Sequence, residues 1–267
     1  MGNAVETAMP TEKRGISGST LKLIAIITMF IDHVGAIIVE RMMLLNAGSA
    51  EGIGVNFYLD NVELTILDLI LRLIGRLGFP IFCFLLIEGF EHTSDVKKYA
   101  IRLFGFAIIS EVAFDLGFCG GFFNWSYQNV FFTLFIGLLV LMIFHWVEQK
   151  QEWNKVLRII AQIVIVAVGM VAAEVLRTDY GAIGILTIAA MYLYRHHRML
   201  QTGLGCMVLT AFNPIEITSF AVMLPIHFYN GRRGWNMKWF FYAFYPLHIL
   251  LLYLVACAMG LGGVLMR

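Results

Sequence analysis

Residues 20–39 read TLKLIAIITMFIDHVGAIIV, a run in which apolar side chains surround one aspartate and one histidine. At about 1.5 Å per residue, a helix of about twenty residues extends about 30 Å, the thickness of the hydrocarbon core of a bilayer. The run therefore predicts a transmembrane helix. Asp32 and His33 lie inside it, where ionisable groups are costly.

The composition extends this prediction to the whole chain. Of 267 residues, 60% are hydrophobic and 14% are charged, and the mean hydropathy is +0.79. A soluble domain has about 25% charged residues. The sequence thus predicts an all-α, polytopic transmembrane helical bundle embedded in the lipid bilayer. The net charge of +1 does not indicate a nucleic-acid partner, and we expect none.

Apolar segments along the chain predict about nine spans, with eight to ten as the range. Most are near the length of about 20 residues that a span needs, and the two that follow residue 199 are short enough to be a helical hairpin. The predicted spans are 20–39, 64–90, 98–118, 130–147, 156–175, 180–194, 200–212, 215–229 and 239–262.

The basic residues support this count. With nine alternating spans and a cytoplasmic N-terminus, fourteen of the nineteen Lys and Arg residues fall on the cytoplasmic side, three fall outside and two lie within a span. Cytoplasmic loops of membrane proteins carry such an excess of Lys and Arg. We therefore expect residues 1–19 to form a polar cytoplasmic tail and residues 20–267 a single transmembrane domain.

Two further features of the sequence, the absence of a cleavage site and the spacing of the cysteines, narrow the classes of protein to consider. No small-residue cleavage site follows the first apolar run, so we expect a retained span instead of a cleaved signal. Cys83, Cys119, Cys206 and Cys257 lie far apart without a CxxC pair. This is neither a zinc pattern nor a disulfide framework, and no metal is predicted.

Ionisable residues at membrane depth indicate where function lies. Each costs about 2.5–3.5 kcal/mol at a helix centre and is a functional candidate by default. Residues four apart share a helix face, so those of the second and third spans form two stripes that we expect to meet the first span in the outer half of the membrane. The residues are Asp32, His33, Asp68, Arg72, Arg76, Glu111 and Asp115.

The geometry of the first span suggests which groups pair. Asp32 and His33 are about 100° apart round the helix, so Asp32 is expected to pair with an arginine and an acid of the third span to orient His33. Pro80 is expected to kink the second span. The alternative interpretation is a buried ion network that only locks three helices together.

Several ordered motifs resemble those of the TraX family over residues 20 to 255. They are Met29-Phe30-Ile31-Asp32-His33-Val34-Gly35, Arg76 to Thr93 with Pro80, Glu88 and His92, Lys98-Tyr99 with Arg102, Ser110-Glu111 with Phe114-Asp115, Asn129 to Thr133, Asp179-Tyr180-Gly181, and Phe244-Tyr245-Pro246-Leu247-His248. The resemblance implies an integral membrane acetyltransferase that acetylates pilin, located in the bacterial cytoplasmic membrane. The family is similar to broader membrane acyltransferases, whose first span carries a basic residue, ten residues and then a histidine, as Lys22 and His33 do here.

The resemblance also implies roles for individual residues. Acetyl-CoA or another acyl-CoA would be the donor substrate, with no tightly bound cofactor, and the acceptor would be a small molecule, peptide or glycan with an amine or hydroxyl. The expected catalytic residues are His33 as general base and Arg72 or Arg76 as the group that stabilises the oxyanion. The second arginine is expected to hold Asp32, Glu111 and Asp115 in place. The expected donor-binding residues are Lys22, His92, Lys98 and Arg102, and the expected acceptor-binding residues are Asn129, Asp179, Tyr180 and His248.

Two other functions use the same residues. A proton- or ion-coupled transporter would use Asp, His and Glu as a proton relay, although the sequence shows no inverted repeat of the kind many transporters have. A non-catalytic assembly factor for a pilus or surface polymer would need the buried charges only for stability. The sequence leaves the acceptor's identity and the oligomeric state open.

Overall fold

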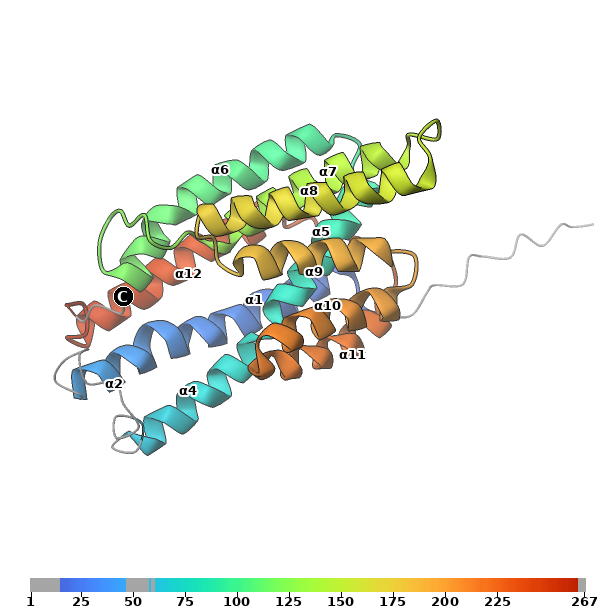
Figure 1. The fold of residues 1–267 in the computed structure, drawn as a ribbon. Coiled ribbons are helices and arrows are strands. Elements are labelled where there is room, and N and C mark those ends of the chain that lie inside the picture. The colour runs from blue at the N-terminus through green and yellow to red at the C-terminus, as the bar shows by residue number, and fades with distance from the viewer. Residues whose placement is uncertain (1–14, 47–57, 59–60, 264–267) are drawn as a thin grey trace, which may run out of the picture.

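The computed structural model describes residues 15–46, 58 and 61–263, and these form a helical bundle (Figure 1). Within them the only β-pairing consists of two isolated bridges, Ile16 with Tyr229 and Gln128 with Thr178. The all-α prediction is confirmed. The elements are α1 Gly18–Val34, π-helix η1 Gly35–Val39, α2 Glu40–Asn46, α4 Val62–Gly75, α5 Gly78–His92, α6 Val96–Phe114, π-helix η3 Asp115–Cys119, α7 Val130–Glu148, α8 Lys155–Val175, α9 Gly181–Leu193, α10 Arg198–Phe212, 3₁₀-helix η4 Pro214–Val222, α11 Met223–His227 and α12 Lys238–Ala258.

Five helical stretches in the described part of the chain are long and apolar enough to cross a membrane. They are Gly18–Asn46, Val62–His92, Val130–Glu148, Lys155–Val175 and Lys238–Ala258. The helix α9 is apolar but has only 13 residues. The number nine therefore stays a prediction.

The helix α8 shows how the outer surface suits lipid. Its Ile163, Val168 and Val175 are 62%, 63% and 73% exposed, an arrangement that water would penalise by about 25 cal/mol per Å² of apolar surface. Buried side chains such as Leu21, Phe84 and Leu138 pack between the helices instead. Hydrocarbon is the solvent that matches this surface.

Helix termini that carry basic residues gather at one end of the bundle, which we call the basic end. Ile16 pairs with Tyr229, and the backbone N–H of Gly18 donates to the Arg232 carbonyl at 2.8 Å. Nearby, Arg195 at the end of α9 pairs with Glu91 of α5 and Glu148 of α7. The described basic residues of these helix ends and of the loops that join them are Lys22, Lys97, Lys98, Arg102, Lys150, Lys155, Arg158, Arg195, Arg198, Arg232, Arg233 and Lys238.

The segments 200–212 and 215–229, predicted as two short spans or a helical hairpin, form a short hairpin that begins and ends at the basic end. Arg198 donates to the Tyr229 carbonyl at 2.7 Å and so ties the two arms together. With 15 residues, α10 rises only about 22 Å, less than a bilayer core of about 30 Å. Pro214 begins η4 directly after the turn, at a position where its missing N–H costs nothing.

The second predicted span is broken in the middle. The helix α4 ends at Gly75 and α5 begins at Gly78, so Pro80 lies in the first turn of α5. The predicted kink is present and precedes the proline, because proline is tolerated at a helix start. Thr218 of η4 donates to the Leu73 carbonyl at 2.9 Å. The hairpin thus satisfies a backbone group that the break leaves free at membrane depth.

Labelling with an impermeant thiol reagent tests the orientation. In a Cys257→Ser background the remaining cysteines are buried, and we expect Trp125→Cys to react from outside intact cells while Glu152→Cys and Asn236→Cys do not. The reason is that the basic end should face the cytoplasm. Permeabilised cells give the control for reactivity of both cytoplasmic positions. Reaction of Glu152→Cys in intact cells would contradict this orientation.

Candidate active site

The charged residues of the first two spans form an ion network around Asp32. Arg72 approaches Asp32 Oδ2 at 2.7 Å, and Arg76 approaches Oδ1 at 3.5 Å. Any side chain at Gly75 would collide with Asp32, so glycine at this position lets α1 and α4 approach closely. The prediction that Asp32 pairs with an arginine is confirmed.

Glu216 of the hairpin completes the network. Its Oε1 accepts a hydrogen bond from Arg76 Nη1 at 3.1 Å, and the residue is 3% exposed. Glu216 was not among the residues predicted for the site, because residues 215–229 were treated only as an apolar segment. The signal was present, since an acid inside an apolar segment is a functional candidate.

His33 is oriented by a histidine, not by an acid of the third span. His33 Nδ1 lies 2.6 Å from His248 Nε2 of α12, and the two rings are nearly parallel, with centroids 4.9 Å apart and planes 5° apart. His248 Nδ1 lies 2.8 Å from the Phe244 carbonyl. The assignment of His33's partner to an acid was therefore wrong. The histidines are 215 positions apart, so the helical period of one span could not reveal their contact.

The acids of the third span bind elsewhere, and the expectation that an arginine holds them was wrong. Glu111 accepts a hydrogen bond from the Asn129 side chain, which caps the N-terminus of α7. Asp115 accepts from the backbone N–H of Asn124 at 2.8 Å. Both acids lie on the stretch formed by α6 and η3, which packs against α7 and α12.

A second cluster of polar residues lies at the start of α9. Tyr127 donates to Asp179 Oδ1 at 2.5 Å, Thr133 donates to the Asp179 carbonyl, and the Tyr180 ring stacks on Phe79. Arg76 interacts electrostatically with Tyr180. Asp179 and Tyr180, predicted as acceptor-binding residues, are thus brought beside the ion network. Asn129 instead caps α7.

A cavity of about 640 Å³ opens at the basic end. All four predicted donor-binding residues line it, together with Arg233 and Lys238, which were not predicted for a site. The inner part is apolar. The basic and histidine residues of the lining are Lys22, His92, Lys98, Arg102, Arg233 and Lys238, and its inner residues include Met29, Val130, Phe131, Leu134 and Tyr245.

The cavity mouth is shaped by the start of α6. Asp95 caps this helix by accepting from the Lys98 backbone N–H at 2.9 Å, which lowers the pKa of the Asp95 carboxyl. This cap fixes the first turn of the helix from which Lys98, Tyr99 and Arg102 line the cavity. Asp95 also forms an ion pair with Lys98.

Tyr245 connects the cavity to the histidine pair. It lines the inner part of the cavity, and its ring lies 6.0 Å from that of His33 and 5.7 Å from that of His248. Phe131 packs against Tyr245 at 5.0 Å. Tyr245 thus contacts both the apolar end of the cavity and His33.

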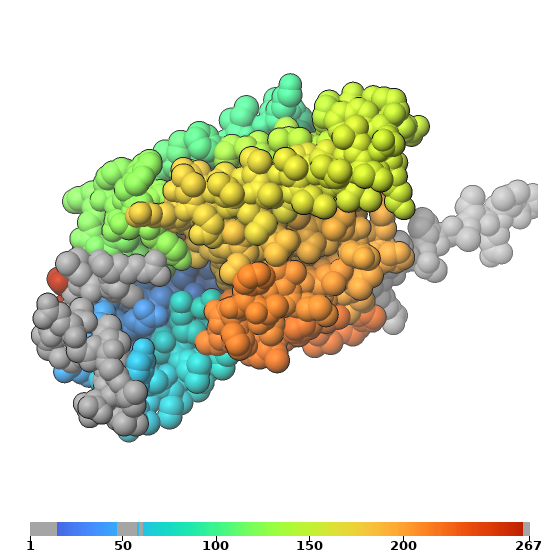
Figure 2. All heavy atoms as spheres, in the orientation of Figure 1, coloured from blue at the N-terminus to red at the C-terminus, as the bar shows by residue number. Residues whose placement is uncertain are grey.

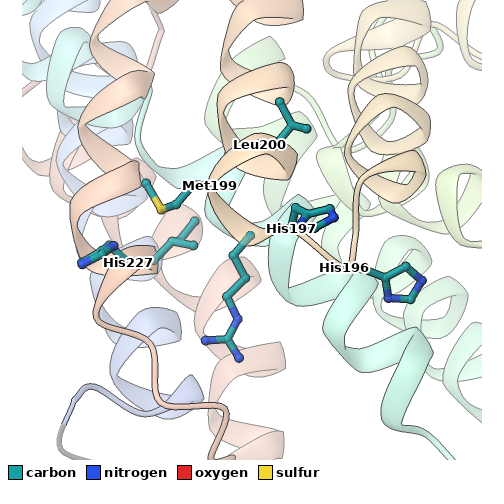
Figure 3. Close-up of a pocket in the computed structure, with 7 residues that line it drawn as sticks. His196, His197, Met199, Leu200 and His227 are labelled. Carbon is teal, nitrogen blue, oxygen red and sulfur yellow. The ribbon is translucent and has the colours of Figure 1, made fainter.

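A second, open pocket of about 810 Å³ at the basic end is unrelated to this chemistry. It is lined by His196, His197, Arg198 and His227 with apolar neighbours, and Figure 3 shows the imidazoles of His196 and His227 on opposite sides. No group of three metal-ligating side chains occurs in the described residues. The pocket holds none of the ionisable residues of the network.

These features define a class: a polytopic helical membrane protein with an ion network and a histidine pair inside the bundle and a basic cavity beside them. Within this class the chain belongs to the TraX protein family, whose pattern matches residues 17–256. It is also similar to a probable fimbrial assembly protein FimC, serogroup H1, of Dichelobacter nodosus. The two are 29% identical over 262 residues, which cover 88% of this chain and 94% of the relative. No solved structure matches the chain.

Proposed function

We propose that this protein is a membrane acyltransferase that moves an acetyl or other acyl group from cytoplasmic acyl-CoA to an amine or hydroxyl acceptor. One observation carries the proposal. A single cavity collects Lys22, His92, Lys98 and Arg102 at the basic end, and its apolar inner part adjoins His33 through Tyr245.

The cavity suits an acyl-CoA because the two ends of that molecule differ. Its phosphates match the basic lining, and its pantetheine arm and thioester match the apolar inner residues. The volume of about 640 Å³ is in the usual range of about 300–1,000 Å³ for ligand pockets. Lys22 and His33 are eleven positions apart, which is three helical turns and about 16 Å. The acyl-CoA donor would therefore extend along α1.

His33 would act as general base. The acceptor N–H or O–H attacks the thioester carbonyl carbon while His33 takes the proton, and a tetrahedral intermediate forms. The C–S bond then breaks, and His33 returns the proton to the thiolate, which leaves acylated acceptor and free CoA thiol. Arg72 and Arg76 are the cations that would stabilise the oxyanion, by about 2–4 kcal/mol in a dry site. Asp32 and Glu216 hold both guanidinium groups in place.

The acceptor would approach from the side away from the basic end. Asp179 and Tyr180 lie there beside Arg76, and Figure 2 shows α1 in a hollow between α4 and the helices drawn in yellow and green. The fimbrial assembly relative supports a role in pilus assembly. The acceptor that we propose for that role is a pilin subunit. The proposed location is the bacterial cytoplasmic membrane, with the basic end and the N-terminus in the cytoplasm.

Incubation of the purified protein with labelled acetyl-CoA tests the proposal. Candidate pilin subunits, peptides and glycans are added, and mass analysis identifies every molecule that gains an acetyl group. Transfer to an acceptor with release of CoA thiol supports the proposal. Absence of transfer to any acceptor by well-folded protein would contradict it.

A second candidate function is a proton- or ion-coupled transporter. The specific observation that favours it is the helix break between α4 and α5 beside the ion network, because transporters place broken helices at their binding sites. Proteoliposomes with a pH-sensitive dye separate the two. Proton flux without acyl transfer would favour transport, and transfer without flux would favour the enzyme.

Lys22→Gln tests the donor cavity. We expect the KM for acyl-CoA to rise several-fold while kcat stays near wild type, because a remote phosphate contact binds ground and transition states alike. Donor binding should also become less sensitive to salt. Lys155→Gln is the matched control, since Lys155 lies at the basic end but does not line the cavity. An unchanged KM with normal insertion would make Lys22 only a membrane anchor.

A further inference from the structure

The imidazole rings of His33 and His248 are close enough that a hydrogen bond must join them. The nitrogen atoms are 2.6 Å apart, so one must donate and the other accept. We propose that His248 is a positioning residue that fixes the tautomer of His33 and leaves His33 Nε2 as the basic nitrogen. The assignment of the catalytic nitrogen rests on the proposed acyl transfer, whereas the tautomer does not.

The direction of the hydrogen bond follows from the Phe244 carbonyl. A carbonyl oxygen only accepts, so His248 Nδ1 at 2.8 Å must carry the proton. A neutral His248 therefore has its lone pair on Nε2. His33 Nδ1 must then be the donor, and the remaining lone pair of His33 lies on Nε2. One backbone carbonyl thus determines the proton positions of both rings.

The surroundings hold the two rings in this geometry. His248 is 4% exposed and stacks on Phe244 at 4.8 Å, and His33 packs edge-on against Phe118 at 5.4 Å and Tyr245 at 6.0 Å. His33 itself is only half-buried. His248 is therefore enclosed, whereas part of His33 stays accessible. This is what we expect of a residue that positions a base and of the base itself.

A neutral partner suits this site better than a carboxylate. Arg72 and Arg76 both act electrostatically on His33, and a carboxylate in place of His248 would compete with Asp32 for them. A neutral imidazole accepts from His33 without this competition. When His33 Nε2 takes the proton of the acceptor, its Nδ1–H bond to His248 becomes charge-assisted and stronger. His248 gains and loses no proton in the cycle.

Nitrogen NMR of the protein in bilayers, with ¹⁵N-labelled histidine, tests the tautomer. A His33→Gln variant identifies the signals of His33 by their loss. At neutral pH we expect the wild-type His33 to carry its proton on Nδ1, and His248→Leu to shift it to a mixture that includes the Nε2–H form. A wild-type His33 protonated on Nε2 would overturn the proposal.

Kinetics test the positioning role through matched variants. His248→Leu should lower kcat by about 100-fold with little change in either KM, since small misplacement of a catalytic group has effects of this size. His248→Gln places an amide acceptor near the position of Nε2 and should recover to within about tenfold of wild type. His227→Leu is the control, because His227 is exposed and outside the site.

The outcomes separate the two proposals. Equal loss in His248→Leu and His248→Gln would overturn the positioning role, because the acceptor atom would not matter. If His248→Leu does not fold, the wild-type NMR signal still tests the tautomer, and the kinetics of His248→Gln still test the positioning role. If the wild-type protein transfers no acyl group, the proposed function fails, and the NMR signal alone confirms or overturns the tautomer.

Discussion

Replacement of His33 by alanine is expected to lower the kcat of acyl transfer by about 10²- to 10⁴-fold, the usual contribution of a general base. Folding and membrane insertion should stay close to wild type, because removal of a neutral ring leaves no charge unpaired. Donor binding should also persist, since His33 does not line the cavity at the basic end. Single-turnover transfer from labelled acetyl-CoA and a separate binding assay measure these effects.

Two further variants make this result interpretable. His33→Gln fills most of the space without supplying a base, so it should be as inactive as His33→Ala. His227→Ala removes an exposed histidine outside the site and should keep full activity. Full transfer activity in His33→Ala would exclude His33 as the base and, with it, the mechanism that we propose.

The largest effect on stability is expected from Arg76→Ala, about 3–5 kcal/mol for a broken buried ion pair. Asp32 keeps Arg72 at 2.7 Å in this variant, so most of the loss comes from Glu216. Glu216 is 3% exposed and forms its ion pair with Arg76. Loss of Arg76 would therefore leave the Glu216 carboxylate without a counter-ion inside the bundle. Unfolding in mixed detergent micelles measures the change.

A double-mutant cycle measures how strongly Arg76 and Glu216 stabilise each other. Arg76→Ala combined with Glu216→Gln should be more stable than Arg76→Ala alone, because no unpaired charge remains. Arg158→Ala at the basic end, where no ion pair is formed with a buried acid, is the matched control and should change stability by less than about 0.5 kcal/mol. A loss in Arg76→Ala as small as in Arg158→Ala would show that the network is not needed for stability.

The predictions that succeeded rest on properties of single segments. Periodicity placed Asp32, Arg72 and Arg76 at membrane depth on faces that meet, and a charge there must find an opposite charge. Lys22, Lys98 and Arg102 were expected at one end because alternating spans return to it, and they line one cavity. Such conclusions need helix geometry and solvation, but no knowledge of how the helices pack.

The failures all concern partners chosen by packing. Glu111 and Asp115 were expected to meet the arginines and instead bind Asn129 and the backbone at Asn124. The segment 200–229 was predicted as two short spans or a helical hairpin, and the hairpin that forms places Glu216, which was not predicted for the site, against Arg76. Local helix geometry specifies the face and the depth of a residue, but it does not specify which neighbour that face meets.

The sequence by itself determined that the chain is a helical membrane protein, where its buried charges lie, and which end of the bundle is basic. These properties follow from the cost of placing polar groups in hydrocarbon, which each segment shows on its own. Only the tertiary structure decided that His248 is the partner of His33 and that Glu216 completes the ion network. Each of these pairs joins segments more than a hundred positions apart, and the packing of α12 and of the hairpin brings them together.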